Sequence, residues 1–276
     1  MRGQCIAGGA AMARSGSEDT LARGSFVRAL RAEALKSRHG APVRLAIVLA
    51  LPFPLLAAFV ALSVPQFGLS YSPWNYWYAL LMPVSITLIA ATVANADARL
   101  GNHTLLSSGV PLHLAWGAKV AWCLALLLLS NLVVFAVYAV MSFVVPQGAA
   151  SMSAMLAVAL ALTVMGSWMI PATHFLTMRV GMLAGVFVPL AVQLALSLGW
   201  SVVPFWPACP PAATIVLPTA FLPVLPSGEP ASPGMALVES ISQGPDVALA
   251  LIVAAVLTAV LTAAGAVWLD RSEELR

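Results

Sequence analysis

Long apolar stretches alternate with short polar segments along most of the chain, after a polar leader that ends near Arg44. A helix that crosses the hydrocarbon core of a bilayer needs roughly 20 predominantly apolar residues. Six stretches meet this requirement, although the fourth is interrupted by Pro171. The stretches are Leu45–Val64, Trp77–Ala94, Val120–Val145, Met152–Leu176, Val180–Val202 and Val247–Leu269. The pattern therefore predicts an all-α, polytopic integral membrane protein with six transmembrane helices.

Two segments outside these stretches have patterns of their own. Residues 25–38 are predicted to form an amphipathic helix at the membrane interface, with basic residues near anionic lipid headgroups; the alternative is a basic flank that only sets topology. We expect its apolar face to hold Phe26, Val27, Leu30 and Ala34. Residues 204–245 form an apolar run with repeated prolines. We expect broken, re-entrant helices there that pack over the bundle before the last span, the alternative being a loose apolar loop.

The basic residues are sorted onto one side of the predicted bundle. All 13 lysines and arginines lie before the first span, beside the second-to-third or fourth-to-fifth loops, or in the C-terminal tail. The other three loops contain none. Because basic loops are retained in the cytoplasm, we expect both termini to be cytoplasmic. Residues 1–24 are expected to be a flexible cytoplasmic tail, with either Met1 or Met12 as the true start, and residues 25–276 the transmembrane domain.

Composition strengthens the membrane assignment and excludes other classes. The chain is 61% hydrophobic and 8% charged, whereas about a quarter of the residues in a soluble domain are charged. The net charge of +3 is small, and no basic groove with interleaved aromatic residues indicates nucleic-acid binding. Cys5, Cys123 and Cys209 are odd in number and widely spaced, so no disulfide framework or metal cluster is predicted.

The predicted spans contain almost no ionisable side chains. A proton-coupled antiporter normally needs such a group at the membrane midplane, so the sequence argues against a secondary transporter. The sequence also contains neither of the enzyme motifs H-E-x-x-H and G-x-S-x-G. We therefore predict no catalytic residue, and we expect His174 to cap a helix or bond between helices. Polar residues within spans ordinarily form interhelical hydrogen bonds. The alternative is a polar substrate path, for which the candidates are Asn131, Gln193 and Trp206.

The chain also lacks the phosphate-binding motif G-x-x-x-x-G-K-[ST]. Uphill transport would therefore draw its energy from another polypeptide. The cytoplasmic loop over residues 95–118 is the predicted docking surface for that partner. We expect a short helix around Gly101–Ser108 and a helix boundary at Pro111.

The order of these features resembles that of type-two ABC exporter permeases, from residue 25 to the C-terminus. The segment from Trp74 to Pro83, WNYWYALLMP, resembles the aromatic-rich entry to the second span in lantibiotic self-immunity permeases. The coupling segment of that family is similar to Asp97-Ala98-Arg99 followed by Leu105-Leu106, Pro111, Trp116 and Lys119. Further similar positions are Ile170-Pro171 with Gly181, and Pro204-Phe205-Trp206-Pro207 with Pro226-Ser227-Gly228. The last triplet departs from the expected Pro-Asn-Gly and leaves the substrate subclass open.

The resemblance implies a permease subunit of an exporter in a bacterial cell membrane. It would pair with a second permease subunit, identical or different, and with two cytoplasmic ATPase subunits that bind ATP and Mg²⁺, while this chain binds no cofactor. The cargo would be a lantibiotic peptide expelled from the producer's own membrane. The implied ATPase-coupling residues are Asp97, Arg99, Asn102, His103, Leu105, Leu106, Pro111 and Lys119. The alternatives are a permease for a drug, lipid or polysaccharide, and a non-transporting membrane scaffold or sensor.

Overall fold

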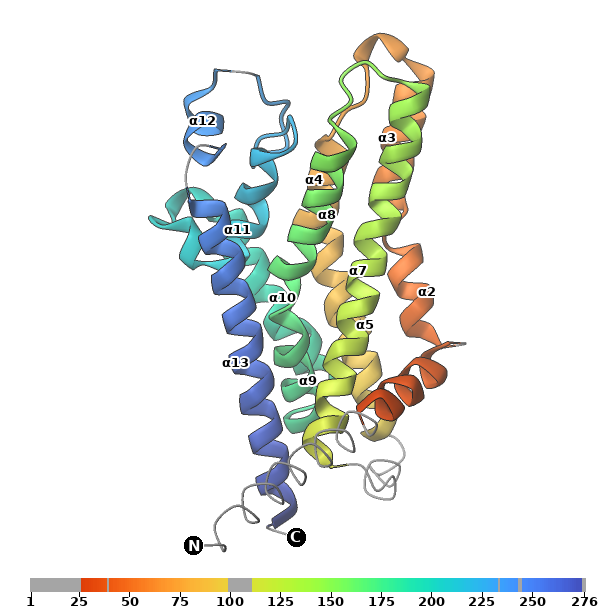
Figure 1. The fold of residues 1–276 in the computed structure, drawn as a ribbon, viewed down its shortest axis with the longest axis vertical. Coiled ribbons are helices and arrows are strands. Elements are labelled where there is room, and N and C mark those ends of the chain that lie inside the picture. Colours follow the sequence, from red (N-terminus) through yellow and green to blue (C-terminus); the bar gives the residue numbers. More distant parts are fainter. Residues whose placement is uncertain (1–25, 39, 99–110, 233, 243–244, 275–276) are drawn as a thin grey trace, which may run out of the picture.

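The described part of the chain is built from helices. A computed structural model describes residues 26–38, 40–98, 111–232, 234–242 and 245–274, and within these ranges the only β-pairing is an isolated bridge between Val224 and Pro230. A helix over residues 26–37 lies at one end of the bundle (Figure 1). The longer helices are α2 (Ala41–Val48), α3 (Pro52–Ser63), α5 (Met82–Ala98), α7 (Leu112–Val144), α8 (Met152–Gly166), α9 (Met169–Arg179), α10 (Met182–Leu198) and α13 (Asp246–Glu274). The short ones are η1 (Pro65–Phe67), α4 (Ser72–Tyr76), η2 (Trp77–Leu81), η3 (Trp200–Val202), η4 (Trp206–Ala208), α11 (Pro210–Val216), η5 (Leu217–Ala220) and α12 (Ala236–Ser242).

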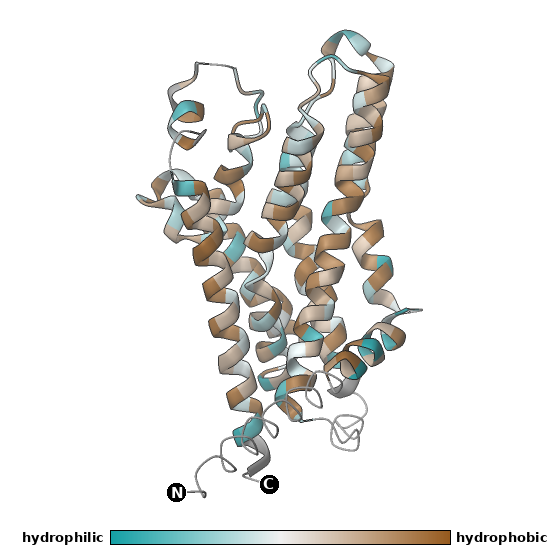
Figure 2. Ribbon diagram, viewed as in Figure 1, coloured by the Kyte–Doolittle hydropathy of each residue, from teal (hydrophilic) through white to brown (hydrophobic). Residues whose placement is uncertain are grey.

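Among the described residues, five helical stretches are long and apolar enough to cross a membrane, which confirms the prediction of an all-α polytopic membrane protein. They are Ala41–Ser63, Ser72–Ala96, Leu112–Val144, Met152–Arg179 and Asp246–Arg271. Apolar residues predominate along these helices (Figure 2). The predicted span Val180–Val202 corresponds to α10, which has 17 residues and is about 25 Å long at 1.5 Å per residue, somewhat less than the hydrocarbon core of a typical bilayer.

Proline interrupts three of the spanning stretches. Pro52 begins α3 after a break that separates it from α2. In the fourth stretch the break falls just before Pro171, where the Ile170 N–H bonds the Ser167 carbonyl at 3.1 Å. Pro83 follows the π-helical turn η2. Because proline has no N–H to bond the carbonyl four residues earlier, the chain accommodates each proline by a break or by a widened turn.

The third span begins earlier than predicted. The sequence pattern placed it at Val120–Val145, but α7 begins at Leu112, directly after Pro111. The first two turns of α7 are half apolar, and Leu112 and Trp116 are buried among neighbouring helices. Helix α7 therefore includes residues that were assigned to a loop, while Pro111 is the helix boundary that the sequence predicted.

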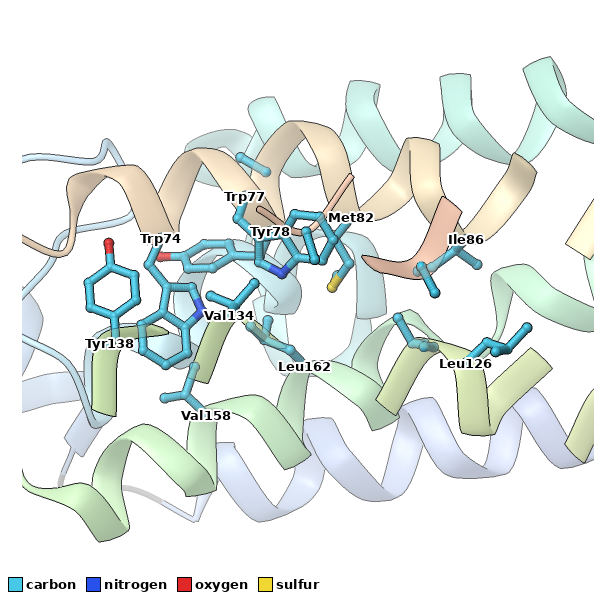
Figure 3. Packing of buried hydrophobic residues seen from close by; sticks show 14 of the residues in the cluster. Trp74, Trp77, Tyr78, Met82, Ile86, Leu126, Val134, Tyr138, Val158 and Leu162 are labelled. Atoms are coloured by element: carbon cyan, nitrogen blue, oxygen red, sulfur yellow. The ribbon is translucent and has the colours of Figure 1, made fainter. Parts of the chain in front are cut away.

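The core lies where α4, η2 and the start of α5 pack between α7 and α8. Figure 3 shows Trp74 beside Tyr138 and Val158, and Met82 close to Leu162. All of these side chains are at most 1% exposed. The aromatic-rich segment that the sequence places at the entry to the second span is therefore packed inside the protein.

Helix α13 is joined to the bundle by small and polar residues. The hydroxyls of Ser167 and Thr258 lie 2.6 Å apart, and Trp116 Nε1 donates to the Thr262 carbonyl at 3.0 Å. Gly265 faces the Trp116 ring so closely that the ring occupies the space of a Cβ atom. A glycine at this position lets α13 and α7 approach each other.

The proline-rich segment before α13 is folded onto the bundle. All seven residues of α11 are buried, and α11 packs against α8, α10 and α13. The prolines Pro210 and Pro211 stand at the first positions of this helix, where a missing N–H has no cost. Residues 210–220 are therefore a packed part of the fold, and the alternative of a loose loop is wrong for them.

Candidate functional site

The residues predicted to contact an ATPase surround a segment that the structure does not describe. The expected short helix at 101–108 falls in that segment. Asp97 lies in the last turn of α5, and Pro111 immediately precedes α7. Outside the described residues are Arg99, Asn102, His103, Leu105 and Leu106. The predicted coupling loop 95–118 is thus shorter than expected, because 95–98 and 112–118 are helical.

Lys119 lies inside the protein. Its side chain is 3% exposed, and its Nζ donates to Glu33 Oε1 at 3.0 Å. The same carboxylate oxygen accepts a hydrogen bond from Lys36 Nζ, also at 3.0 Å. Because Glu33 belongs to the helix over residues 26–37, this ion pair joins that helix to α7. In the structure, the Lys119 side chain thus connects the N-terminal helix to α7.

Apolar contacts support the same junction between the N-terminal helix and α7. A Cβ atom at Gly117 would lie 3.6 Å from the Phe26 ring, and Ser37 is buried beside Glu33 on the inward side. A helix therefore lies where the amphipathic helix was predicted. Of the residues expected on its apolar face, Phe26 packs at Gly117, whereas Val27 is 62% exposed.

A second buried polar group, His174 of α9, faces α7 at Cys123, one helical turn beyond Lys119. His174 Nδ1 is 2.8 Å from the Ile170 carbonyl, and since a carbonyl only accepts, Nδ1 carries the proton. Nε2 then faces the Cys123 thiol at 3.9 Å, and the Trp116 ring meets the imidazole edge-on at 5.8 Å. His174 thus bonds within its own helix and contacts α7 through Cys123, as the expected capping or interhelical role requires.

Asn131, a candidate for a substrate path, uses both ends of its amide in contacts between helices. Its Oδ1 accepts from Trp77 Nε1 at 3.1 Å, and its Nδ2 donates to Thr163 Oγ1 at 3.1 Å. Thr163 in turn donates to the Ala159 carbonyl at 2.8 Å. With Asn131 1% exposed, this chain of bonds ties η2, α7 and α8 together.

The other two candidates, Gln193 and Trp206, lie next to α11. Gln193 Nε2 donates to the Pro211 carbonyl at 3.4 Å, while its buried Oε1 has no hydrogen-bond partner among the described residues. Trp206 is half-buried in η4 and packs against a small cluster that includes Leu217. The structure therefore brings Gln193 and Trp206 to the same short helix, and it places Asn131 at a separate interface.

Asn75 is a site residue that the sequence analysis did not single out. Its Nδ2 donates to the Tyr78 hydroxyl at 2.8 Å and lies 3.3 Å from the Leu225 carbonyl and 3.4 Å from that of Pro226. Gly228, with φ +89°, completes this turn. A Cβ atom at this position would lie 3.3 Å from Asn75 Oδ1. The aromatic entry to the second span and the Pro226-Ser227-Gly228 turn, 150 residues apart, are therefore in contact.

Aromatic side chains close this end of the bundle beside Asn75. The rings of Tyr71 and Tyr138 stack at 5.2 Å, and Trp74 lies 4.6 Å from Tyr138. The Tyr71 hydroxyl accepts from the Ala150 N–H at 2.7 Å and faces Met155 Sδ at 3.6 Å. Burial raises the pKa of Tyr71, and the Ala150 hydrogen bond offsets this in part, so the hydroxyl stays protonated and joins the second span to the 146–151 loop.

The site as a whole is a set of paired polar groups between helices, and the described basic residues lie at one end of it. Within the described ranges, no three histidine, cysteine or acidic side chains cluster as a metal site would require. The described basic residues lie on the helix over 26–37, on α2 and at the ends of α7, α9 and α13 that share its side, whereas Glu229, Glu239 and Asp246 lie at the other end. Comparison of the chain with protein-family models, curated proteins and solved structures gave no match.

Proposed function

We propose that this chain is the membrane-spanning permease subunit of an ATP-driven exporter of the type-two ABC class. The observation that carries the proposal is the contact between Asn75 and the Leu225–Pro226 carbonyls at 3.3 and 3.4 Å. It joins the two segments on which the family resemblance rests, the aromatic entry to the second span and the turn at residues 226–228. Such a contact is expected if the segment before the last span covers the outer end of a transport domain.

The proposed topology has six spans with both termini in the cytoplasm of a bacterial cell. In this topology α10 is the fifth crossing and α13 the sixth. The helix over 26–37 and the end of α13 lie at the same end of the molecule (Figure 1), as an even number of crossings would place them. The described basic residues gather at this end, as the positive-inside rule expects. Helix α11, too short to span, then dips into the outer leaflet, where burial by α8, α10 and α13 supplies the cover that irregular backbone needs.

The energy source in this proposal is ATP, bound with Mg²⁺ by partner subunits. The described spans offer little for ion coupling, because Lys119 is already paired with Glu33 and His174 with a backbone carbonyl. The partners would be two ATPase subunits at the loop that contains residues 99–110, and a second permease subunit, identical or different. The proposed cargo is a lantibiotic peptide expelled for self-protection. A drug, lipid or polysaccharide is the alternative cargo.

Co-purification tests the proposal. The tagged protein is extracted in mild detergent from the native host as wild type, as Leu105→Asp in the proposed coupling loop, and as Phe67→Asp. The last variant is a matched control, because Phe67 is 73% exposed at the opposite end of the bundle. We expect an ATPase subunit to co-purify with the wild type and with Phe67→Asp, and to be reduced by Leu105→Asp.

The absence of any ATPase under conditions that preserve other ABC complexes would overturn the proposal in favour of a scaffold or sensor. If an ATPase is present, a deletion strain is next exposed to nisin-type peptides. Increased sensitivity supports a peptide cargo, whereas unchanged sensitivity rejects that cargo and leaves the exporter assignment in place.

A further inference from the structure

The outward face of the helix over residues 26–37 combines arginines with exposed apolar side chains. Arg31 lies in this helix and Arg38 in the turn that directly follows it, and both are exposed. Val27 and Leu35 flank them and are 62% and 58% exposed. In water this arrangement would leave two large aliphatic groups uncovered.

The inward face fixes the helix in this orientation. Glu33 is bound to Lys119 of α7 at 3.0 Å, and Phe26 packs at Gly117. Since both contacts lie on the side opposite Arg31 and Leu35, the helix cannot turn its aliphatic residues inward without breaking a buried ion pair. The mixed face is therefore a fixed feature of the folded protein.

The described acidic side chains at this end do not neutralise these arginines. Glu33 binds Lys36 and Lys119, and Asp270 lies 3.7 Å from His113. None of these ion pairs includes Arg31 or Arg38. The next helix, α2, begins three residues after Arg38, carries the exposed Arg44, and then exposes apolar residues along its length, which places the arginines at the boundary between charged and apolar surface.

We propose that this face, defined by Arg31, Arg38, Val27 and Leu35, binds anionic phospholipid in the leaflet beside it. The guanidinium groups would contact the headgroup phosphates, for which their planar donor arrangement is suited, and the two aliphatic side chains would enter the acyl boundary. An anionic lipid satisfies both chemistries of the face at once. An acidic protein surface would match the arginines and would leave Val27 and Leu35 without apolar cover.

The test is lipid retention by the full-length protein. Wild-type protein is purified in mild detergent containing equal amounts of phosphatidylglycerol and phosphatidylcholine, and the bound lipids are counted by native mass spectrometry. The double variant Arg31→Gln/Arg38→Gln is compared with Arg179→Gln/Arg271→Gln, which removes the same charge from exposed arginines at the same end. Gel filtration verifies that both variants stay folded.

We expect wild type and the Arg179/Arg271 control to retain phosphatidylglycerol over phosphatidylcholine. In the Arg31/Arg38 variant, the preference for phosphatidylglycerol should fall roughly 5-fold for each arginine removed. This factor corresponds to the attraction of about 1 kcal/mol between each basic residue and an anionic membrane surface. Equal retention of the two lipids by wild type overturns the proposal, as does an equal loss in both double variants, which would indicate a general charge effect. Loss of a co-purifying acidic protein with unchanged lipid retention would also overturn it. None of these outcomes depends on an ATPase partner.

Discussion

Removing Glu33 should release the N-terminal helix from the bundle. Its carboxylate is the described acidic group that faces Lys119, whose side chain is 3% exposed. Breaking a buried ion pair by removing one partner costs about 3–5 kcal/mol, because the remaining charge is left uncompensated. We therefore expect Glu33→Met to raise the undocked fraction of the helix by roughly a hundredfold or more, at about 1.4 kcal/mol per factor of ten.

Neighbouring variants should follow an order that the geometry fixes. Lys119→Met leaves Glu33 paired with Lys36 and should cost less, about 1.5–3 kcal/mol for a lost hydrogen bond to a charged group. Lys36→Met should cost about 0.5 kcal/mol or less, since its side chain is 42% exposed and exposed pairs contribute little. The double variant Glu33→Met/Lys119→Met should recover most of the loss, because apolar replacement of a whole buried pair is often nearly neutral.

Limited trypsin digestion in detergent measures this equilibrium directly. Cleavage after Arg31 requires local unfolding or undocking of the helix, and its rate reports the population of the open state. Thermal unfolding of each variant checks that the rest of the bundle is intact. The reasoning is refuted if Lys36→Met opens the helix as much as Glu33→Met does, or if the double variant is as open as the sum of the two single ones.

Three further results follow from the packing and the charge distribution. Gly265→Ala should lower stability by about 1–3 kcal/mol through overpacking against the tryptophan ring it faces, whereas Gly117→Ala, whose Cβ would make only an ordinary 3.6 Å contact with the Phe26 ring, should be neutral or stabilising; equal thermal shifts in detergent would contradict this. Asn131→Leu should cost about 1–3 kcal/mol by leaving a buried indole N–H unpaired, and a midpoint unchanged from wild type would disprove that. In a cysteine-free background, Ser232→Cys should react with a membrane-impermeant maleimide in intact cells and Arg38→Cys should not, and the reverse pattern would invert the proposed topology.

The positions of the apolar helices could be predicted because hydropathy and proline chemistry act locally. A stretch such as 247–269 has few alternatives to a helix once its solvent is lipid, and it is part of α13. The break before Pro171 follows from the missing N–H of proline. Neither prediction depends on which helices are in contact, and both were confirmed.

The start of α7 was misplaced because Lys119 was treated as a membrane flank. A lysine ordinarily marks the end of a span, since an unpaired charge in an apolar setting is costly. Here Glu33, 86 residues earlier, supplies the opposite charge and removes that restriction. The same contact turns Glu33 of the N-terminal helix inward, while Val27 lies on the outward side. A pattern of apolar residues cannot show that an acid belongs to the buried face.

Polar contacts between distant segments therefore carry most of the information that the hydropathy pattern lacks. In a lipid environment apolar contact does not by itself favour one helix partner over another, so small residues and hydrogen bonds decide which helices pair. Three of the buried polar groups each join a different pair of elements: Glu33 joins the N-terminal helix to α7, Ser167 joins α8 to α13, and Asn75 joins the second span to the turn at residues 226–228. Because each contact joins a different pair of elements, removing one should loosen one junction and leave the other helices in place. This locality is what makes the trypsin assay informative, since it separates release of the N-terminal helix from unfolding of the bundle.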